Sequence, residues 1–237
     1  YKSLNEALDH AGIVNLAKVD IQMIDAAKIT KTNVSKILKS FQAVLVPGGF
    51  GSRGIEGMIY ACQFARENKL PYFGICLGMQ IAIIEFSRNI LKLKNANSTE
   101  FNTKTKHPVI GLVTEWKDAS GKTEHRSERS DLGGTMRLGG QQCLIKKSSL
   151  SHKLYKKLTI TERHRHRYEV NPEYKNELIA GGMDIVGTSL DGNLAEMIEI
   201  TNHPWFLGCQ FHPEFTSNPR DGHPIFNDFI AKAIKIK

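Results

Sequence analysis

The stretch PYFGICLGMQIA, Pro71–Ala82, joins an apolar run typical of a buried strand to a helical pattern, through a turn that holds one cysteine between two glycines. Strand, sharp turn and helix in this order form the layout of a nucleophile elbow, with cysteine where the hydrolase version has serine. Gly74 and Gly78 leave room for a tight backbone from which the Cys76 side chain projects, and the following helix N-terminus favours its thiolate. The stretch therefore predicts a nucleophilic cysteine rather than one that only fills the core.

A base and an orienting group for this thiol are found in FLGCQFHPEF, Phe206–Phe215. His212 and Glu214 are two residues apart at the end of an apolar run, so in extended backbone they face the same side, roughly 6–7 Å apart. Pro213 between them is expected at a strand end, because it donates no ladder hydrogen bond. We expect His212 to take the Cys76 proton while Glu214 holds the other ring nitrogen.

The elements around these two sites alternate between strand and helix, which predicts an α/β fold with a doubly wound, mostly parallel sheet flanked by helices. The run AVLVPGG, residues 43–49, reads as a central parallel strand, and SLNEALDHAG, residues 3–12, as a helix that begins with a Ser3–Glu6 capping box. Between residues 95 and 140 the pattern loosens into polar segments. The other predicted strands cover residues 19–24, 71–76, 184–190, 194–200 and 205–211, and the other helices cover 57–67, 78–88 and 225–233.

The composition of the chain limits the classes of protein to which it can belong. The chain has 237 residues, 41% of them hydrophobic, enough for one sizeable core. Its four cysteines form no C-x-x-C pair, which favours a cytoplasmic chain with reduced thiols and no structural zinc or other metal. The sequence shows no basic-then-apolar leader that would predict secretion, and no apolar run of about 18 residues that would predict a membrane span.

The net charge of +8 and the basic run ERHRHRYE, residues 162–169, raise the question of nucleic acid. Elsewhere the lysines are scattered over predicted helical faces, so we expect no nucleic-acid partner. Two nucleotide-binding patterns are incomplete. GFGSRG, residues 49–54, has no acidic residue at the end of the next strand, and Trp116 stands where a phosphate loop ending in GKT, residues 121–123, needs glycine.

With Cys76, FHPE and PGGFG in place, the chain resembles the class I glutamine amidotransferases. The resemblance is narrower within that class: a series of ordered blocks is similar to the glutaminase domain of the CTP synthase family. The blocks are VPGGFGSRGIEG, GICLGMQ, NSTEF, DLGGTMRLG, ERHRHRYEVNP and HPWFLGCQFHPEFTSNPRDGHP. The resemblance implies a Cys-His-Glu triad that hydrolyses glutamine through a cysteine thioester, and ammonia supplied to the ATP-dependent amination of UTP to CTP.

The resemblance also implies roles for other residues. Gly49 and Leu77 would donate backbone N–H groups to the oxyanion, and Arg167 would bind the α-carboxylate of glutamine. Further substrate-binding positions are Gly78, Met79, Gln80 and Glu100. A mobile loop associated with GTP activation would contain Gly134, Thr135, Met136, Arg137, Leu138 and Gly139. The remaining members of RHRHRY, including His164 and His166, would be structural or would line a domain interface.

The partners implied are L-glutamine and an N-terminal synthetase domain of the same enzyme. On this interpretation residues 1–237 are one glutaminase domain that lacks the family's first strand and the synthetase half. The domain itself would need no cofactor, whereas the full-length enzyme would use ATP and Mg²⁺, respond to GTP and form a homo-oligomer, a tetramer in the family.

Two other classes of function stay open. A γ-glutamyl peptidase, or another Cys-His-Glu hydrolase of the same fold, would use the same triad on peptides or folate-like chains. A catalytically silent interaction module would be expected to lose a triad residue, and none is missing. The blocks GGTMRLG and RHRHRYE favour the glutaminase over the peptidase.

Overall fold

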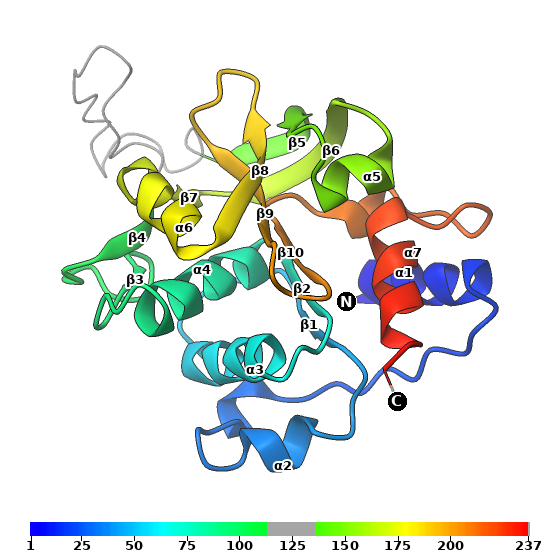
Figure 1. The fold of residues 1–237 in the computed structure, drawn as a ribbon, viewed down its shortest axis with the longest axis horizontal. Coiled ribbons are helices and arrows are strands. Elements are labelled where there is room, and N and C mark those ends of the chain that lie inside the picture. The colour runs from blue at the N-terminus through cyan, green and yellow to red at the C-terminus, as the bar shows by residue number, and fades with distance from the viewer. Residues whose placement is uncertain (113–135, 237) are drawn as a thin grey trace.

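A mixed seven-stranded sheet forms the centre of the computed structural model, which describes residues 1–112 and 136–236 (Figure 1). The neighbouring strands are, in spatial order, β1 (Val44–Val46), β2 (Tyr72–Ile75), β10 (Phe206–Cys209), β9 (Ala195–Ile200), β8 (Met183–Ser189), β5 (Arg137–Ile145) and β6 (Thr159–His166). A smaller sheet contains β3 (Asn97–Ser98), β4 (Pro108–Leu112) and β7 (Tyr168–Val170).

Parallel pairing is limited to one side of the large sheet. Strands β1 and β10 both pair in parallel with β2, whereas the pairs from β10 through β9, β8 and β5 to β6 are antiparallel. The predicted α/β class is therefore confirmed, but the sheet is mixed rather than mostly parallel. Strand β1 lies at the edge of the described sheet, so its expected central position is wrong.

Helices cover both faces of the parallel part of the sheet. The helices are α1 (Lys2–Val14), α2 (Val34–Leu38), α3 (Ile55–Glu67), α4 (Leu77–Asn89), α5 (Leu150–Tyr155), α6 (Lys175–Gly181) and α7 (Pro224–Ala233). Short 3-10 helices are η1 (Ala26–Lys28), η3 (Pro172–Tyr174) and η4 (Pro213–Phe215). Figure 1 shows α3 and α4 on one side of β2, and α1 packed against α7 on the other.

The alternation of side chains along β2 and β10 explains this double cover. Tyr72 and Phe206 stack with ring centroids 4.5 Å apart and belong to the core cluster that includes α3 and α4. Phe73 points to the opposite face, where its ring lies 5.2 Å from that of Phe226 in α7. Each such buried aromatic side chain contributes roughly 1.5–3 kcal/mol. Two packed faces therefore hold the carboxyl ends of β2 and β10 side by side.

The strongly apolar elements and the helix predicted over residues 3–12, which is α1, lie where the sequence predicts them, whereas two other predictions for the N-terminal segment are wrong. Helix α1 begins after Tyr1 without a side-chain cap, so the Ser3–Glu6 capping box is wrong. Residues 19–24 form no strand, since their alternation reflects packing of Val19 and Ile21 on the core without a neighbouring ladder. Strands β4 and β5 arise within the segment that appeared loose, because β5 alternates exposed and half-buried positions and contains Gly139 and Gly140.

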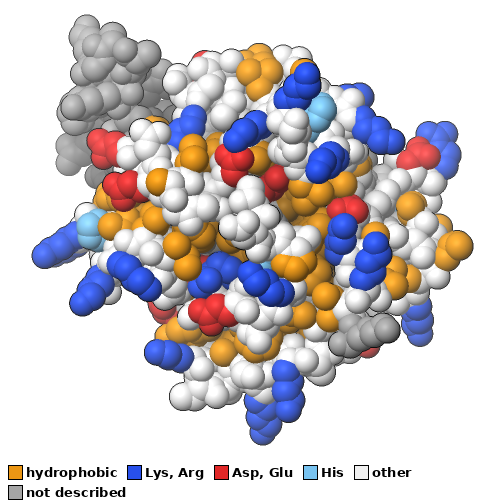
Figure 2. Space-filling view, in the orientation of Figure 1, with side chains coloured by type: hydrophobic (Ala, Val, Ile, Leu, Met, Phe, Trp, Pro, Cys, Tyr) orange, Lys and Arg blue, Asp and Glu red, His pale blue; other side chains and the backbone are white. Residues whose placement is uncertain are grey.

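Charged side chains are spread over the surface rather than gathered in one stripe on the face drawn in Figure 2, where Lys and Arg surround apolar side chains. Within residues 1–112 and 136–236, no helix has the length and apolar character needed to cross a membrane. The same described residues contain no cluster of three His, Cys, Asp or Glu side chains suited to a metal ion.

Candidate active site

Cys76 occupies the turn between β2 and α4 in a backbone conformation that few non-glycine residues adopt. Its φ is 51° and its ψ is −102°, a combination that costs about 1–3 kcal/mol unless the surroundings hold it. Its N–H donates to the Cys209 carbonyl at 2.7 Å, which ties the turn to β10. A Cβ atom on Gly78 would lie 2.0 Å from the Val46 carbonyl oxygen, and one on Gly74 would lie 2.5 Å from Gly78. Both glycines are therefore required by close backbone contacts.

His212 and Glu214 meet beside this turn, but in a tighter geometry than the extended one predicted. His212 is the N-cap residue of η4, and its Nδ1 lies 2.8 Å from Oε1 of Glu214. The His212 N–H donates to the Arg163 carbonyl at 2.8 Å, and the Phe215 ring stacks on the imidazole with centroids 5.5 Å apart. The imidazole is thus held from several sides, and it lies beside Cys76, since a Cβ atom on Gly48 would lie 2.6 Å from Cε1 of His212 and 3.5 Å from Cβ of Cys76.

The protonation of His212 follows from these contacts. Burial by itself lowers its pKa, but the hydrogen bonds to Cys76 and Glu214 and their charges outweigh burial and raise the pKa to about 10. The shift favours the protonated form of the His212 imidazole. The pair is therefore set up for attack by sulfur followed by proton delivery to a leaving group.

The candidate oxyanion donors lie close together. A Cβ atom on Gly49 would lie 3.2 Å from Cδ2 of Leu77, so the β1–α3 loop passes over the start of α4. Leu77 is the first residue of α4, where a backbone N–H has no acceptor within its own helix. Two N–H groups directed at one point beside a thiol stabilise a tetrahedral oxyanion, and this role of Gly49 and Leu77 stays a prediction.

The substrate-binding candidates differ in how free their side chains are. The Glu100 carboxylate accepts from Gly51 N–H at 2.9 Å, and burial raises its pKa against that hydrogen bond. Arg167 is half-buried where the chain passes from β6 to β7, and its guanidinium has no hydrogen bond or ion pair within the described residues. Met79 is fully buried against Gly208, so only its backbone is available to a ligand.

Gln80 is committed to the protein interior. Its side chain is 3% exposed, and its Nε2 donates to the Tyr168 carbonyl at 3.0 Å and to Oε1 of Gln210 at 3.2 Å. Both amide hydrogens are thereby used, which leaves Oε1 to accept a hydrogen bond. Gln210 itself escaped the sequence analysis, although a lone amide within the apolar run FLGCQF is the signal that could have indicated it.

The expected mobile loop is only partly within the described residues. Gly134 and Thr135 lie outside them, and Met136 directly precedes β5. Arg137, Leu138 and Gly139 belong to β5 and pair with His166, Arg165 and His164 of β6. In the structure these three residues form part of an antiparallel ladder, and their expected mobility stays a prediction.

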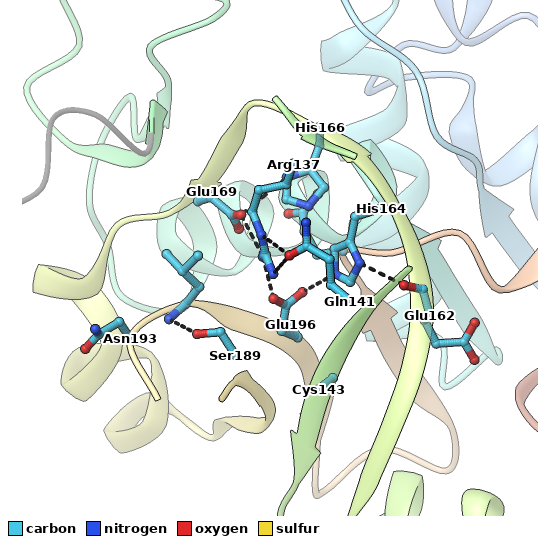
Figure 3. A network of polar contacts seen from close by, with 12 residues as sticks. Arg137, Gln141, Cys143, Glu162, His164, His166, Glu169, Ser189, Asn193 and Glu196 are labelled. Atoms are coloured by element: carbon cyan, nitrogen blue, oxygen red, sulfur yellow. Dashed lines mark hydrogen bonds and ion pairs between the residues drawn. The ribbon is translucent and has the colours of Figure 1, made fainter. Parts of the chain in front are cut away.

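Arg137 forms the centre of a buried polar network that the sequence analysis missed (Figure 3). Its guanidinium lies 3.0 Å from Oε1 of Glu169, pairs with Glu196, and donates to Oε1 of Gln141. Glu196 also contacts Nε2 of His164 at 2.7 Å. Burial and the charge of Glu196 raise the pKa of Glu169 to about 8, against the opposing effect of Arg137. The network ties β5, β6 and β9 of the large sheet to β7 of the small one.

This network adjoins the candidate site through its backbone. The Glu196 carbonyl accepts from Gln210 N–H at 2.8 Å, two residues before His212. His166, whose Nδ1 lies 3.4 Å from Glu169, is buried, and burial lowers its pKa well below the usual value. His164 and His166 therefore face the interior and help to fix the scaffold, in line with the structural option for RHRHRY.

Comparisons with known proteins identify the family of the chain. The family model described as Glutamine amidotransferase class-I matches residues 1–232. The glutaminase domain of Trypanosoma brucei CTPS, solved with bound acivicin, is 36% identical with a TM-score of 0.88, covering 100% of this chain and 89% of that one. A Thermoplasma acidophilum protein described as a GMP synthase component is 14% identical with a TM-score of 0.54, covering 97% of this chain and 86% of the other, and shows the fold alone.

The chain belongs to the class I glutamine amidotransferase family. Within that family it is similar, over its whole length, to the glutaminase domain of CTP synthase, and it is an enzyme with glutamine-hydrolysing activity.

The geometry around Gly48 leads to a first prediction. A Cβ atom at this position would lie 2.6 Å from Cε1 of His212, which Glu214 and Phe215 hold in place. Gly48→Ala should therefore displace the imidazole, and a misplacement of about 1 Å should lower kcat for glutamine roughly a hundredfold. Steady-state ammonia release measures the effect. Gly140→Ala is the matched control, because its Cβ would meet Thr161 at 3.5 Å, an ordinary contact. A folded Gly48→Ala variant with the rate of the control would show that the His212 position is not critical.

Proposed function

We propose that this chain hydrolyses L-glutamine to glutamate and ammonia through a γ-glutamyl thioester on Cys76. The observation that carries the proposal is the grouping of Cys76, His212 and Glu214: His212 lies 2.8 Å from Glu214, and both His212 and Cys76, which occupies a positive-φ turn, adjoin Gly48. The Cys76 thiolate attacks the amide carbonyl carbon, and the resulting oxyanion accepts hydrogen bonds from Gly49 and Leu77 N–H.

Collapse of this intermediate breaks the carbon–nitrogen bond, and the His212 imidazolium gives its proton to the departing nitrogen, which leaves as ammonia. His212 then takes a proton from water, whose oxygen attacks the thioester, and the sulfur departs as the leaving group. The products are glutamate and the restored Cys76–His212 pair. The imidazolium proton leaves with ammonia, and the proton that His212 takes from water restores the imidazolium.

Substrate recognition is assigned to groups of opposite charge at the two ends of the amino acid. Arg167, whose guanidinium has no ion pair within the described chain, binds the α-carboxylate. Glu100 and Oε1 of Gln80 accept from the α-ammonium group. Gly78 and Met79 contribute backbone atoms at the start of α4, because their side-chain positions pack against Val46 and Gly208.

The ammonia serves a synthetase domain of the CTP synthase type, which uses ATP and Mg²⁺ to aminate UTP to CTP. Similarity to a CTP synthase glutaminase domain over the whole chain supports this part of the proposal. We assign GTP activation to the predicted loop, residues 134–139, of which Gly134 and Thr135 lie outside the described residues. The glutaminase domain supplies ammonia and needs no cofactor of its own.

The test is ammonia release from glutamine by this chain, measured alone and with a synthetase domain, ATP, Mg²⁺ and UTP. We expect slow release alone, little stimulation by GTP until the synthetase domain is present, and CTP only in its presence, because domain contacts orient the substrate. Faster cleavage of a γ-glutamyl peptide than of glutamine would favour the peptidase instead. Strong GTP activation of the chain alone would show that the effector site is self-contained.

A further inference from the structure

Gln210 places a side-chain amide directly against the reactive sulfur. It follows the last residue of β10, is fully buried, and its Nε2 lies 3.6 Å from Sγ of Cys76. Its backbone N–H is fixed by the Glu196 carbonyl at 2.8 Å. The amide therefore approaches the sulfur from a strand whose position is set independently of Cys76.

The orientation of this amide is fixed by a second glutamine. Nε2 of Gln80 lies 3.0 Å from the Tyr168 carbonyl oxygen, an atom that can only accept, so this end of Gln80 must be its NH₂ group. The Gln210 atom 3.2 Å from that NH₂ group must then be an acceptor, its Oε1. The opposite end of Gln210, which faces the sulfur, is consequently an NH₂ donor.

From this arrangement we propose that Gln210 is a catalytic hydrogen-bond donor to the Cys76 sulfur and that Gln80 is the positioning residue that keeps the donor aimed at it. The inference rests on the proposed role of Cys76 as nucleophile. With the His212 imidazolium on one side and the Gln210 amide on the other, two donors converge on one sulfur. A thiolate can accept from both, whereas a thiol also has a proton of its own to place.

The burial of this amide argues against a filling role. Gln210 lies between Cys209 and Phe211, both fully buried, where an apolar side chain would avoid the cost of desolvating an amide. The amide is instead satisfied at both ends, by Gln80 and by the sulfur. Charge-assisted hydrogen bonds are roughly twice as strong as neutral ones, so donation to a thiolate compensates for burial better than donation to a thiol.

The test compares Gln210→Met and Gln210→Glu. Methionine keeps the length and removes the donor, whereas glutamate keeps the shape and the bond from Gln80 but turns an acceptor toward the sulfur. At neutral pH we expect Gln210→Met to lower both kcat and the rate of Cys76 alkylation by iodoacetamide about tenfold, with KM for glutamine nearly unchanged. We expect both kcat and the alkylation rate to be lower still in Gln210→Glu. The ultraviolet absorbance of the Cys76 thiolate, measured as the difference from Cys76→Ala, should be lower in Gln210→Met than in the unsubstituted enzyme and lowest in Gln210→Glu.

Two further variants keep the test decisive. Gln80→Met leaves Gln210 in place but removes the hydrogen bond that orients its amide. Alkylation of Cys76, which does not involve the substrate glutamine, should therefore slow, but by a smaller factor than in Gln210→Met. Gln63→Met makes the same exchange on the outer surface of α3, and its kcat and alkylation rate should equal those of the unsubstituted enzyme. Thermal melting identifies any variant that fails to fold.

The outcomes separate this inference from the proposed function. Full glutamine hydrolysis by Cys76→Ala would overturn the proposed function and this inference with it. Loss of activity in Cys76→Ala, combined with unchanged alkylation in folded Gln210→Met and Gln80→Met, would overturn the inference alone. A Gln210→Glu variant that reacts faster than Gln210→Met would also overturn it, because that order is expected if Gln210 only fills space.

Discussion

Replacing Cys76 with alanine should lower glutamine hydrolysis by about 10⁴-fold or more, because removal of a triad nucleophile leaves only binding and oxyanion stabilisation. Ammonia release measures the loss, and thermal melting should show a folded protein. Cys62→Ala is the matched control. Cys62 lies in α3, where burial raises its pKa well above the usual value, so it should not support catalysis. Comparable activity in the two variants would contradict the assignment of the nucleophile.

The same assignment predicts which thiol reacts with a glutamine-like electrophile. All four cysteines are buried, and burial raises the pKa of Cys62, Cys143 and Cys209. Only Cys76 lies at a turn with a hydrogen-bonded imidazole. Peptide mapping should therefore find the label on Cys76, and equal labelling of Cys209 would be incompatible with the site.

The elbow could be predicted from sequence because its requirements are local. Gly74 and Gly78 flank Cys76 closely, and the contacts that exclude a Cβ at both positions arise from the turn and from the neighbouring strand β1. The apolar runs on either side are dense enough to identify a buried strand and a helix. A short segment therefore contained both the turn geometry and the identity of its central residue.

The meeting of Cys76 and His212 depends on pairing between distant segments. Strand β10 pairs in parallel with β2, with Gly208 opposite Gly74 and Cys209 opposite Ile75, and this register brings the two strand ends together. No pattern within either segment specifies that register. From the sequence alone, their proximity could be expected only through chemistry and family resemblance.

The role of Arg137 could not be inferred from its neighbours. It follows a glycine-rich segment that reads as a loop, yet β5 pairs with β6 from this residue onward, and its side chain joins Glu169 and Glu196. Those carboxylates lie on other strands, Glu196 within LAEMIEI and Glu169 at the end of the basic run ERHRHRYE. A buried ion network of this kind becomes visible only once the sheet has been assembled.

Glu214→Gln should lower kcat by about 10²- to 10⁴-fold while leaving the fold intact. Oε1 of Glu214 lies 2.8 Å from Nδ1 of His212 and both side chains are largely buried, so the carboxylate sets the ring orientation and stabilises the imidazolium. A glutamine amide can turn its NH₂ toward Nδ1, which favours the wrong tautomer. Steady-state ammonia release gives the rate, and Glu173→Gln, the same exchange at an exposed position, is the control.

The pH dependence supplies a sharper form of this prediction. Burial lowers the pKa of His212, but the bonds to Cys76 and Glu214 raise it from the usual 6.5 to about 10, so the imidazolium persists until the pH rises through that value. Activity that needs this proton should decline near pH 10, and in Glu214→Gln the decline should move to lower pH. Folding stability should change with pH in the same direction as activity. The stability that comes from the raised pKa of His212 is fully present below pH 6.5 and is lost as the pH approaches 10. The difference in melting temperature between the unchanged enzyme and Glu214→Gln should therefore narrow across this range. An identical alkaline limb in both proteins would show that Glu214 does not stabilise the imidazolium.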